Sequence, residues 1–219
     1  MEFRWDLVIE SFPLLLVAAG VTIKITALSV GIGMCIGIFA GIFRASPLAP
    51  LRWISTIYID FIRGTPLLVQ LFILYFGLPA MIGRPIDPFI AAITACGINS
   101  GAYVGEIFRS GIQAVDKGQM EAGRSLGMSY IQTMQFIILP QAFKQVLPPL
   151  GNEFIAMLKD SSLVSVIGFE ELTRRGQLII ARTYGSFEIW MCVAVIHLVM
   201  TLTISQFVAW LERRYRIQT

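Results

Sequence analysis

The sequence contains little charge. Only 14% of its 219 residues are Asp, Glu, Lys or Arg, against about 25% in ordinary soluble domains. Hydrophobic residues make up 56% of the chain. A soluble protein of this length needs more polar side chains to cover its surface, whereas a lipid bilayer requires an apolar surface. The composition therefore excludes an ordinary soluble domain and predicts an integral membrane protein.

The chain is also poor in residues for disulfide, metal or nucleotide chemistry. Its three cysteines, Cys35, Cys96 and Cys192, lie in apolar runs without CxxC spacing, which predicts reduced, buried thiols and no metal site. No G-x-x-x-x-G-K-[ST] phosphate loop occurs, so we expect the chain not to be an ATPase. The opening MEFRWDLVIES carries acids and lacks a short apolar core, so we expect no cleaved signal peptide. No repeat or long linker divides the chain, which predicts one transmembrane domain over residues 1–219.

Long apolar runs predict an all-α, polytopic fold, because about twenty helical residues cross roughly 30 Å of hydrocarbon. Five runs are long enough: Phe12–Phe43, Trp53–Ile82, Phe89–Phe108, Phe143–Gly168 and Phe187–Trp210. When these spans alternate, ten Lys and Arg residues fall on one side and five on the other. Because the positive side faces the cytoplasm, we expect the C-terminus inside and the N-terminus outside.

In the first run, Gly33, Gly37 and Gly41 recur at every fourth residue. This spacing places them on one face of a helix, where a neighbouring backbone can approach closely. We interpret the stripe as structural packing.

The most specific pattern is the polar segment Glu121–Pro140, EAGRSLGMSYIQTMQFIILP, between two apolar runs. Its spacing of E-A-G, then Gly127, then I-x-L-P resembles the EAA signature of permease subunits of ATP-binding-cassette importers. The family usually has alanine where this chain has Gly123, and both residues are small. The resemblance implies a type I importer permease fold with a cytoplasmic coupling helix, in which Glu121, Ala122, Gly123, Gly127 and Pro140 serve coupling to an ATPase.

Three further stretches resemble the polar amino-acid permeases of the histidine, glutamine and arginine uptake branch. They are RGTPLLVQ at 63–70, GAYVGEIFR at 101–109, and GNEF at 151–154 followed by KDSSL at 159–163. The resemblance implies a prokaryotic inner membrane, two copies of an ATP-binding subunit that holds ATP and Mg²⁺, and an external solute-binding protein. It also implies a second permease, identical or homologous, and no cofactor or metal in this chain.

Ionisable groups in lipid are costly, so each needs a partner or a purpose. Glu106 with Arg109, and Asp60 with Arg63, have the spacing of intrahelical ion pairs. Glu153 and Asp160 lie seven residues apart, on nearly one face and about 10 Å apart if the helix is continuous. Lys159 points roughly 100° away from Asp160 and cannot neutralise both acids.

At least one of these carboxylates is therefore left for a cationic ligand, and the alternative is that neighbouring arginines, hydroxyls or backbone groups satisfy both. The prolines before the acids and Ser161 and Ser162 after them predict an interrupted helix whose exposed groups bind an amino acid. Asn99 and Tyr103, one turn apart, are further candidates for this pocket, and core hydrogen bonding explains them equally well. The hypothesis is a permease for basic L-amino acids (arginine, histidine or lysine), with glutamine or another neutral polar amino acid as the alternative.

Two other classes of function are possible on the residues alone. Ser100 and the single histidine, His197, would form the dyad of an intramembrane serine protease, but this explains neither the Glu121–Pro140 segment nor the acids at 153 and 160. A passive channel needs no docking segment for an ATPase. We therefore favour the permease.

Overall fold

A computed structural model describes residues 3–215, and this part of the chain is helical without strands. The longest helix, α1 (Trp5–Arg44), is followed by α2 (Ala49–Arg63) and by a second helical segment made of α3 (Leu67–Phe72), a π-helical stretch (Ile73–Gly77) and α4 (Leu78–Ile82). Helix α5 (Pro88–Gln113) leads to the short helices α6 (Lys117–Ser125) and α7 (Tyr130–Thr133). A π-helical stretch (Met134–Ile138), α8 (Leu139–Asp160), a 3₁₀ helix (Ser161–Ile167), α9 (Leu172–Thr183) and α10 (Ser186–Tyr215) complete the chain.

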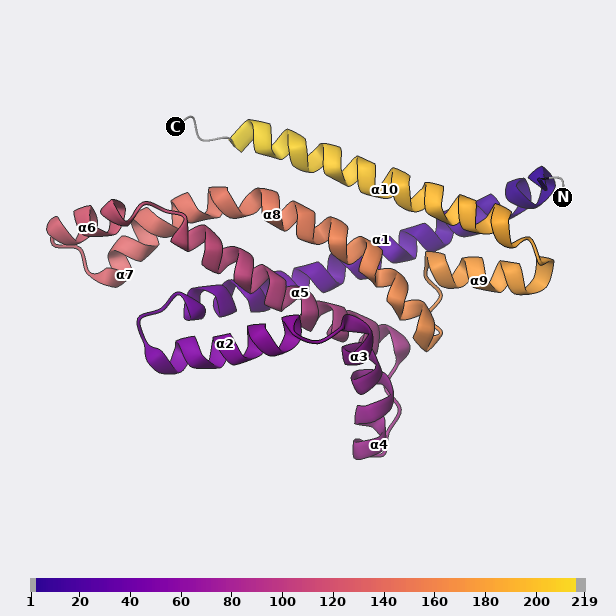
Figure 1. Ribbon diagram of the computed structural model, residues 1–219, viewed down its shortest axis with the longest axis horizontal. Helices are drawn as coiled ribbons and strands as arrows, with labels where there is room; N and C mark the ends of the chain where they lie inside the picture. The colour runs from indigo at the N-terminus through magenta and orange to yellow at the C-terminus, as the bar shows by residue number, and fades with distance from the viewer. Residues whose placement is uncertain (1–2, 216–219) are drawn as a thin grey trace.

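Four long helices, α1, α5, α8 and α10, run lengthwise through the molecule (Figure 1). Helices α6 and α7 form one end, and α9 lies at the other end near the start of α1. The segment of α3 and α4 projects away from the lengthwise helices. This arrangement separates the polar Glu121–Pro140 segment from the region around α9.

Helix α1 packs most extensively against α5, and its glycine stripe forms this contact. A Cβ atom added to Gly37 would lie 2.5 Å from Cβ of Val104, and one added to Gly41 would lie 2.6 Å from the carbonyl oxygen of Gly105. Real atoms do not approach so closely, so only glycine permits this separation of the two backbones. The predicted packing role of the stripe is confirmed.

The second apolar run, Trp53–Ile82, was predicted as a single span, but in the structure it is sharply bent. Helix α2 and the helix from Leu67 to Ile82 meet at an angle of 99° across Gly64, Thr65 and Pro66. Proline disfavours a helical conformation in the residue before it, so the chain bends at Thr65.

By length and composition within the described residues, α1 and α10 are apolar enough to cross a membrane, and the bent pair qualifies if it is one span. Helices α5 and α8 have the length, but polar residues such as Asn99 and Glu153 lower their apolarity. The count of five spans therefore stays a prediction. The outward face of α10 carries exposed large apolar side chains, as a lipid-facing helix requires: Phe187, Leu198, Val199, Leu202, Phe207 and Trp210.

Candidate functional site

Glu153 is the most deeply buried acid of the four lengthwise helices. It lies on α8, is only 8% exposed, and accepts a hydrogen bond of 2.9 Å from the hydroxyl of Ser100 on α5. The helix is continuous from Leu139 to Asp160, so the premise that Glu153 and Asp160 share one helix is confirmed. A hydroxyl partner for Glu153 was one of the predicted alternatives, but the sequence did not identify Ser100 as that partner.

Asp160 differs from Glu153 in its surroundings. It is exposed at the last position of α8, and none of the six ion pairs among the described residues includes it. The predicted interruption follows at once, because the chain changes from α-helix to 3₁₀ helix at Ser161. The prolines at 148 and 149, in contrast, lie inside α8 without ending it. Ser161 is buried and its hydroxyl donates to the carbonyl of Leu158 at 2.8 Å, so that hydroxyl serves the helix end.

Asn99 belongs to a buried amide network at the bend. Its Nδ2 donates to Oε1 of Gln70 at 3.1 Å. Nε2 of Gln70 donates to the carbonyls of Ile62 and Thr65 at 2.8 and 3.0 Å, on the other side of Pro66. Gln70 therefore fastens α3 to the end of α2 and holds Asn99 from across the bend. Gln70 is the last residue of the RGTPLLVQ stretch, and an amide in an apolar run is a usable signal for such a buried contact.

Tyr103, one turn beyond Asn99, is 38% exposed, and the guanidinium of Arg63 lies 5.3 Å from the centre of its ring. No hydrogen bond joins Tyr103 to Asn99 in the described part of the chain. Ser162 lines a pocket with Lys159 and His197 on the side of α8 that faces α10. The predicted residues thus lie along α5, α8 and the start of the following 3₁₀ helix, and their joint role in binding a substrate stays a prediction.

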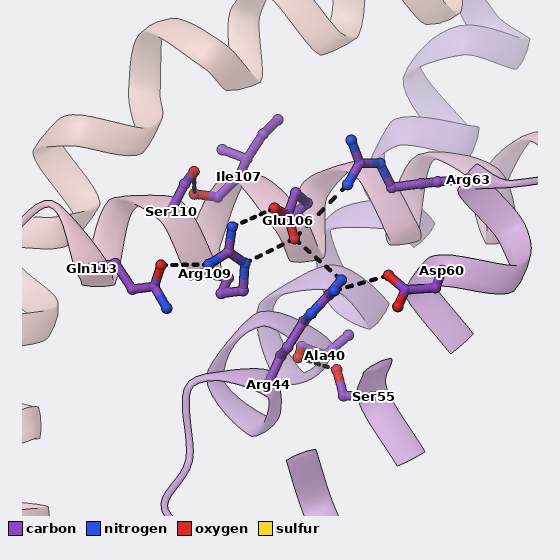
Figure 2. A network of polar contacts seen from close by, with 10 residues as sticks. All are labelled: Ala40, Arg44, Ser55, Asp60, Arg63, Glu106, Ile107, Arg109, Ser110 and Gln113. Carbon is purple, nitrogen blue, oxygen red and sulfur yellow. Dashed lines mark hydrogen bonds and ion pairs between the residues drawn. The ribbon is translucent and has the colours of Figure 1, made fainter. Parts of the chain in front are cut away.

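One carboxylate, Glu106, gathers three arginines from three helices (Figure 2). Arg109 binds it through two nitrogens at 2.9 and 2.5 Å, which confirms that predicted pair. Arg44 from the end of α1 lies 3.2 Å from it, and Arg63 from the end of α2 lies 3.8 Å from it. The cluster ties the ends of α1 and α2 to the middle of α5.

The predicted pair of Asp60 with Arg63 is wrong. Asp60 instead accepts a hydrogen bond of 2.8 Å from Arg44 (Figure 2). The last turn of α1 lies against α2, and the long Arg44 side chain reaches both Asp60 and Glu106. Arg63 turns toward Glu106 and the Tyr103 ring, contacts that helical spacing alone does not reveal.

Ser100 and His197 do not form a dyad. The Ser100 hydroxyl donates to Glu153, and Nδ1 of His197 lies 3.1 Å from the carbonyl of Val193 in its own helix. A nucleophilic serine needs a base within hydrogen-bond reach, and no hydrogen bond joins these two residues in the described structure. The arrangement gives no support to a protease.

The Glu121–Pro140 segment forms two short helices and a turn. Asp116 caps α6 by accepting from the amide of Gly118 at 2.7 Å, and Ser129 with Gln132 forms a capping box at the start of α7. Gly127 between them has a φ of +82°, a conformation that favours glycine and lets the chain turn sharply. Glu121, Ala122 and Leu126 are exposed beside this turn.

Two features of this segment differ from expectation. Gly123 is buried, and a Cβ added there would lie 2.5 Å from Cγ2 of Thr133, so its small size serves packing within the chain. Pro140, the last residue of the segment, stands in the first turn of α8, but the helical run that includes α8 begins before it, at Tyr130. Proline is tolerated there because a π-helical stretch precedes it and it stands in the first turn of α8.

A family model described as "Binding-protein-dependent transport system inner membrane component" matches residues 33–217. The chain belongs to this family. Among curated relatives, the glutamine transport system permease protein GlnP of Escherichia coli K12 is 44% identical, over 99% of this chain and 100% of the relative. The arginine transport system permease protein ArtQ of Bacillus subtilis is 39% identical, over 99% of each chain. The resemblance to permease subunits of amino-acid importers is confirmed.

Solved structures agree with this family. A chain of a structure titled "Crystal structure of an amino acid ABC transporter with histidines" is 47% identical and superposes with a TM-score of 0.91, over 98% of this chain and 99% of that chain. The MetNI methionine ABC transporter, at 18% identity and a TM-score of 0.81 over 93% of this chain and 97% of that chain, shows the shared fold. The all-helical permease fold of this inner membrane family is thereby established.

Proposed function

We propose that this chain is the permease subunit of an ATP-driven importer that passes polar, basic L-amino acids inward. The observation that carries this proposal is the pair of acids on α8. Glu153 is buried with the Ser100 hydroxyl as its partner, and Asp160 has no ion pair within the described residues. The names of the relatives, which include glutamine and arginine permeases, support an amino-acid substrate.

The preference for a basic substrate follows from electrostatics. Glu153 is buried and its negative charge is therefore poorly solvated, and Asp160, two turns later on the same helix face, adds repulsion to that charge. A ligand with both an α-ammonium and a cationic side chain relieves this repulsion better than a neutral amino acid. Glutamine is the second candidate, because GlnP is 44% identical and the Asn99–Gln70 network offers neutral amide groups.

The proposed assembly supplies what this chain lacks. No phosphate loop occurs in the sequence, so two ATP-binding subunits that hold ATP and Mg²⁺ would power transport. A second permease, identical or homologous, would enclose the path, and an external solute-binding protein would deliver the substrate. The Lys and Arg distribution supports a cytoplasmic location for the C-terminus and the Glu121–Pro140 segment, with the N-terminus outside.

Replacing Glu153 by glutamine tests the charge while it keeps the side-chain volume. Loss of one charge-assisted contact should weaken arginine binding by roughly 1.5 to 3 kcal/mol, about ten-fold to over a hundred-fold in affinity. Glutamine binding should change less. The measurement is direct binding of radiolabelled arginine and glutamine to the assembled complex without its binding protein, together with stimulation of ATP hydrolysis by each amino acid.

Glu212→Gln is the matched control, because Glu212 is an exposed acid near the end of α10. Arginine binding that is equal in the Glu153→Gln and Glu212→Gln variants would show that Glu153 is structural. The basic-substrate proposal would then lose its physical basis, and the glutamine alternative would take its place.

A further inference from the structure

A pocket of about 610 Å³ separates the α6–α7 segment from the ends of α1 and α5. One wall comes from Ala45, just after α1, and from the end of α5 with its link to α6. The other wall comes from α6, α7 and the π-helical stretch after α7. Its volume lies within the range of small-molecule sites, about 300 to 1,000 Å³. None of the candidate substrate residues and none of the residues expected to serve ATPase coupling line it.

Two opposite charges that line this pocket are free of ion pairs. Asp116 and Lys117 are adjacent and exposed, and neither takes part in any of the six ion pairs of residues 3–215. Asp116 caps α6 through Oδ1, which accepts from the amide of Gly118, and its Oδ2 stays available. A zwitterion complements this pair, because a carboxylate accepts from the ammonium of Lys117 and an ammonium donates to Oδ2 of Asp116.

The floor of the pocket is apolar. Ile112, Val115 and Ile138 are buried there, and the thioether side chains of Met120 and Met134 pack partly buried against the same cluster. Methionine is flexible and adapts to ligands of different shape. The floor is therefore suited to the hydrocarbon stem of a side chain.

Tyr130 lines the pocket from α7. It is half-buried, and its hydroxyl makes no hydrogen bond within residues 3–215. A tyrosine ring attracts a cation, and its hydroxyl both donates and accepts. The guanidinium of arginine fits the ring, and the side-chain amide of glutamine fits the hydroxyl. The pocket thus combines groups for an α-carboxylate, an α-ammonium, an apolar stem and a polar tip.

We infer that this pocket is a regulatory site for the amino acid that the importer delivers. The carboxylate of the amino acid accepts from Lys117, its ammonium donates to Asp116, and its side chain lies on the apolar floor and ends at Tyr130. The inference rests on the proposed function, including the cytoplasmic location of α6 and α7. It deepens that function by adding control of import by its own product.

Binding in this pocket would restrain the segment proposed to contact the ATPase. A ligand there contacts α6 and α7 on one side and the ends of α1 and α5 on the other. A ligand that binds one arrangement of these parts more tightly than another shifts the population toward that arrangement. We therefore expect accumulated product to slow both uptake and ATP hydrolysis.

The test uses proteoliposomes that contain the complete complex, with ATP inside and the solute-binding protein and radiolabelled arginine outside. Unlabelled arginine is enclosed at increasing concentrations, and initial uptake and ATP hydrolysis are measured. Both rates of the unmodified complex should fall as internal arginine rises. The rates of each variant are compared with those of the same variant without internal amino acid, so that a general loss of activity is not mistaken for lost inhibition.

Two variants separate the two charged contacts. Lys117→Met should raise the internal arginine concentration that halves uptake by about ten-fold or more, because a charge-assisted contact is lost. Agmatine lacks the carboxylate, so it should inhibit the variant and the unmodified complex equally. Asp116→Asn still caps α6 and should weaken inhibition by arginine by a similar factor. It should leave inhibition by 5-guanidinopentanoate, which lacks the α-amino group, unchanged. Lys144→Met is the matched control, because Lys144 is an exposed lysine of α8 that does not line the pocket.

Several outcomes would overturn the inference. Uptake that internal arginine and glutamine do not slow would do so, as would equal inhibition of Lys117→Met and Lys144→Met. Loss of inhibition in Glu153→Gln with full inhibition in Lys117→Met would place the inhibitory site in the substrate path. Release of the ATPase from Lys117→Met with unchanged inhibition would assign the pocket to the ATPase contact. All of these outcomes leave the proposed function intact, whereas a complex that imports neither arginine nor glutamine would contradict the proposed function itself.

Discussion

At the scale of single residues, the Glu106 carboxylate contacts arginines from more helices than Asp60 does. It is 23% exposed and lies within 4 Å of arginines from three helices, whereas Asp60 is 57% exposed and has Arg44 as its partner. Removing one acid from a shielded cluster leaves the arginines facing each other. An exposed pair, in contrast, contributes little because water screens it.

Glu106→Gln should therefore destabilise the protein much more than Asp60→Asn. We expect a loss of about 1 to 3 kcal/mol for Glu106→Gln, since Glu106 is only partly exposed, and about 0 to 1 kcal/mol for Asp60→Asn. Thermal unfolding of the purified complex in detergent measures both, and the amide keeps the side-chain volume in each case. Equal stability of the two variants would show that the cluster is electrostatically unimportant.

At the scale of helices, the separation of α1 and α5 depends on glycine at defined positions. Gly37 faces Val104, whereas a Cβ added to Gly31 in the same helix would meet nothing within 4 Å. Gly37→Val should force the helices apart and destabilise the protein by about 1 to 3 kcal/mol, as overpacking does. Gly31→Val should be close to neutral. Resistance of the two variants to heat and to protease in detergent makes the comparison, and equal resistance would contradict the close contact.

The helices themselves could be predicted largely from apolar runs, and the glycine stripe from its period of four. The 99° bend was signalled by Gly64 and Pro66, but a run of apolar residues does not reveal the direction of the chain after a break. The contacts of Arg44 and Gln70 could not be predicted, because each joins helices whose relative placement depends on tertiary packing. The buried side of Gly123 was missed for the same reason, since the motif does not show which face packs inward.

At the scale of the whole molecule, one helical run connects the two candidate sites. It starts at Tyr130 beside the Gly127 turn, continues through the π-helical stretch and α8, and ends at Asp160 (Figure 1). Glu153 therefore lies on the same helical run as the segment proposed to contact the ATPase. A displacement at Tyr130 can reach Glu153 along this run without passing through a loop, although Pro148 and Pro149 each remove one backbone hydrogen bond from it.

Gly127 tests that connection. Leu126 beside it is 82% exposed, and a Cβ on Gly127 would meet nothing within 4 Å, so a bulky side chain there points into space that the ATP-binding subunit is proposed to occupy. Gly83 is a matched control, because its φ of +70° imposes similar strain of about 1 to 2 kcal/mol and its Cβ also meets nothing. Gly127→Trp should uncouple ATP hydrolysis from uptake or release the ATPase while membrane insertion remains, whereas Gly83→Trp should retain coupling. The measurement is uptake per ATP hydrolysed in proteoliposomes, and normal coupling in Gly127→Trp would disprove the assignment of this turn to the ATPase contact.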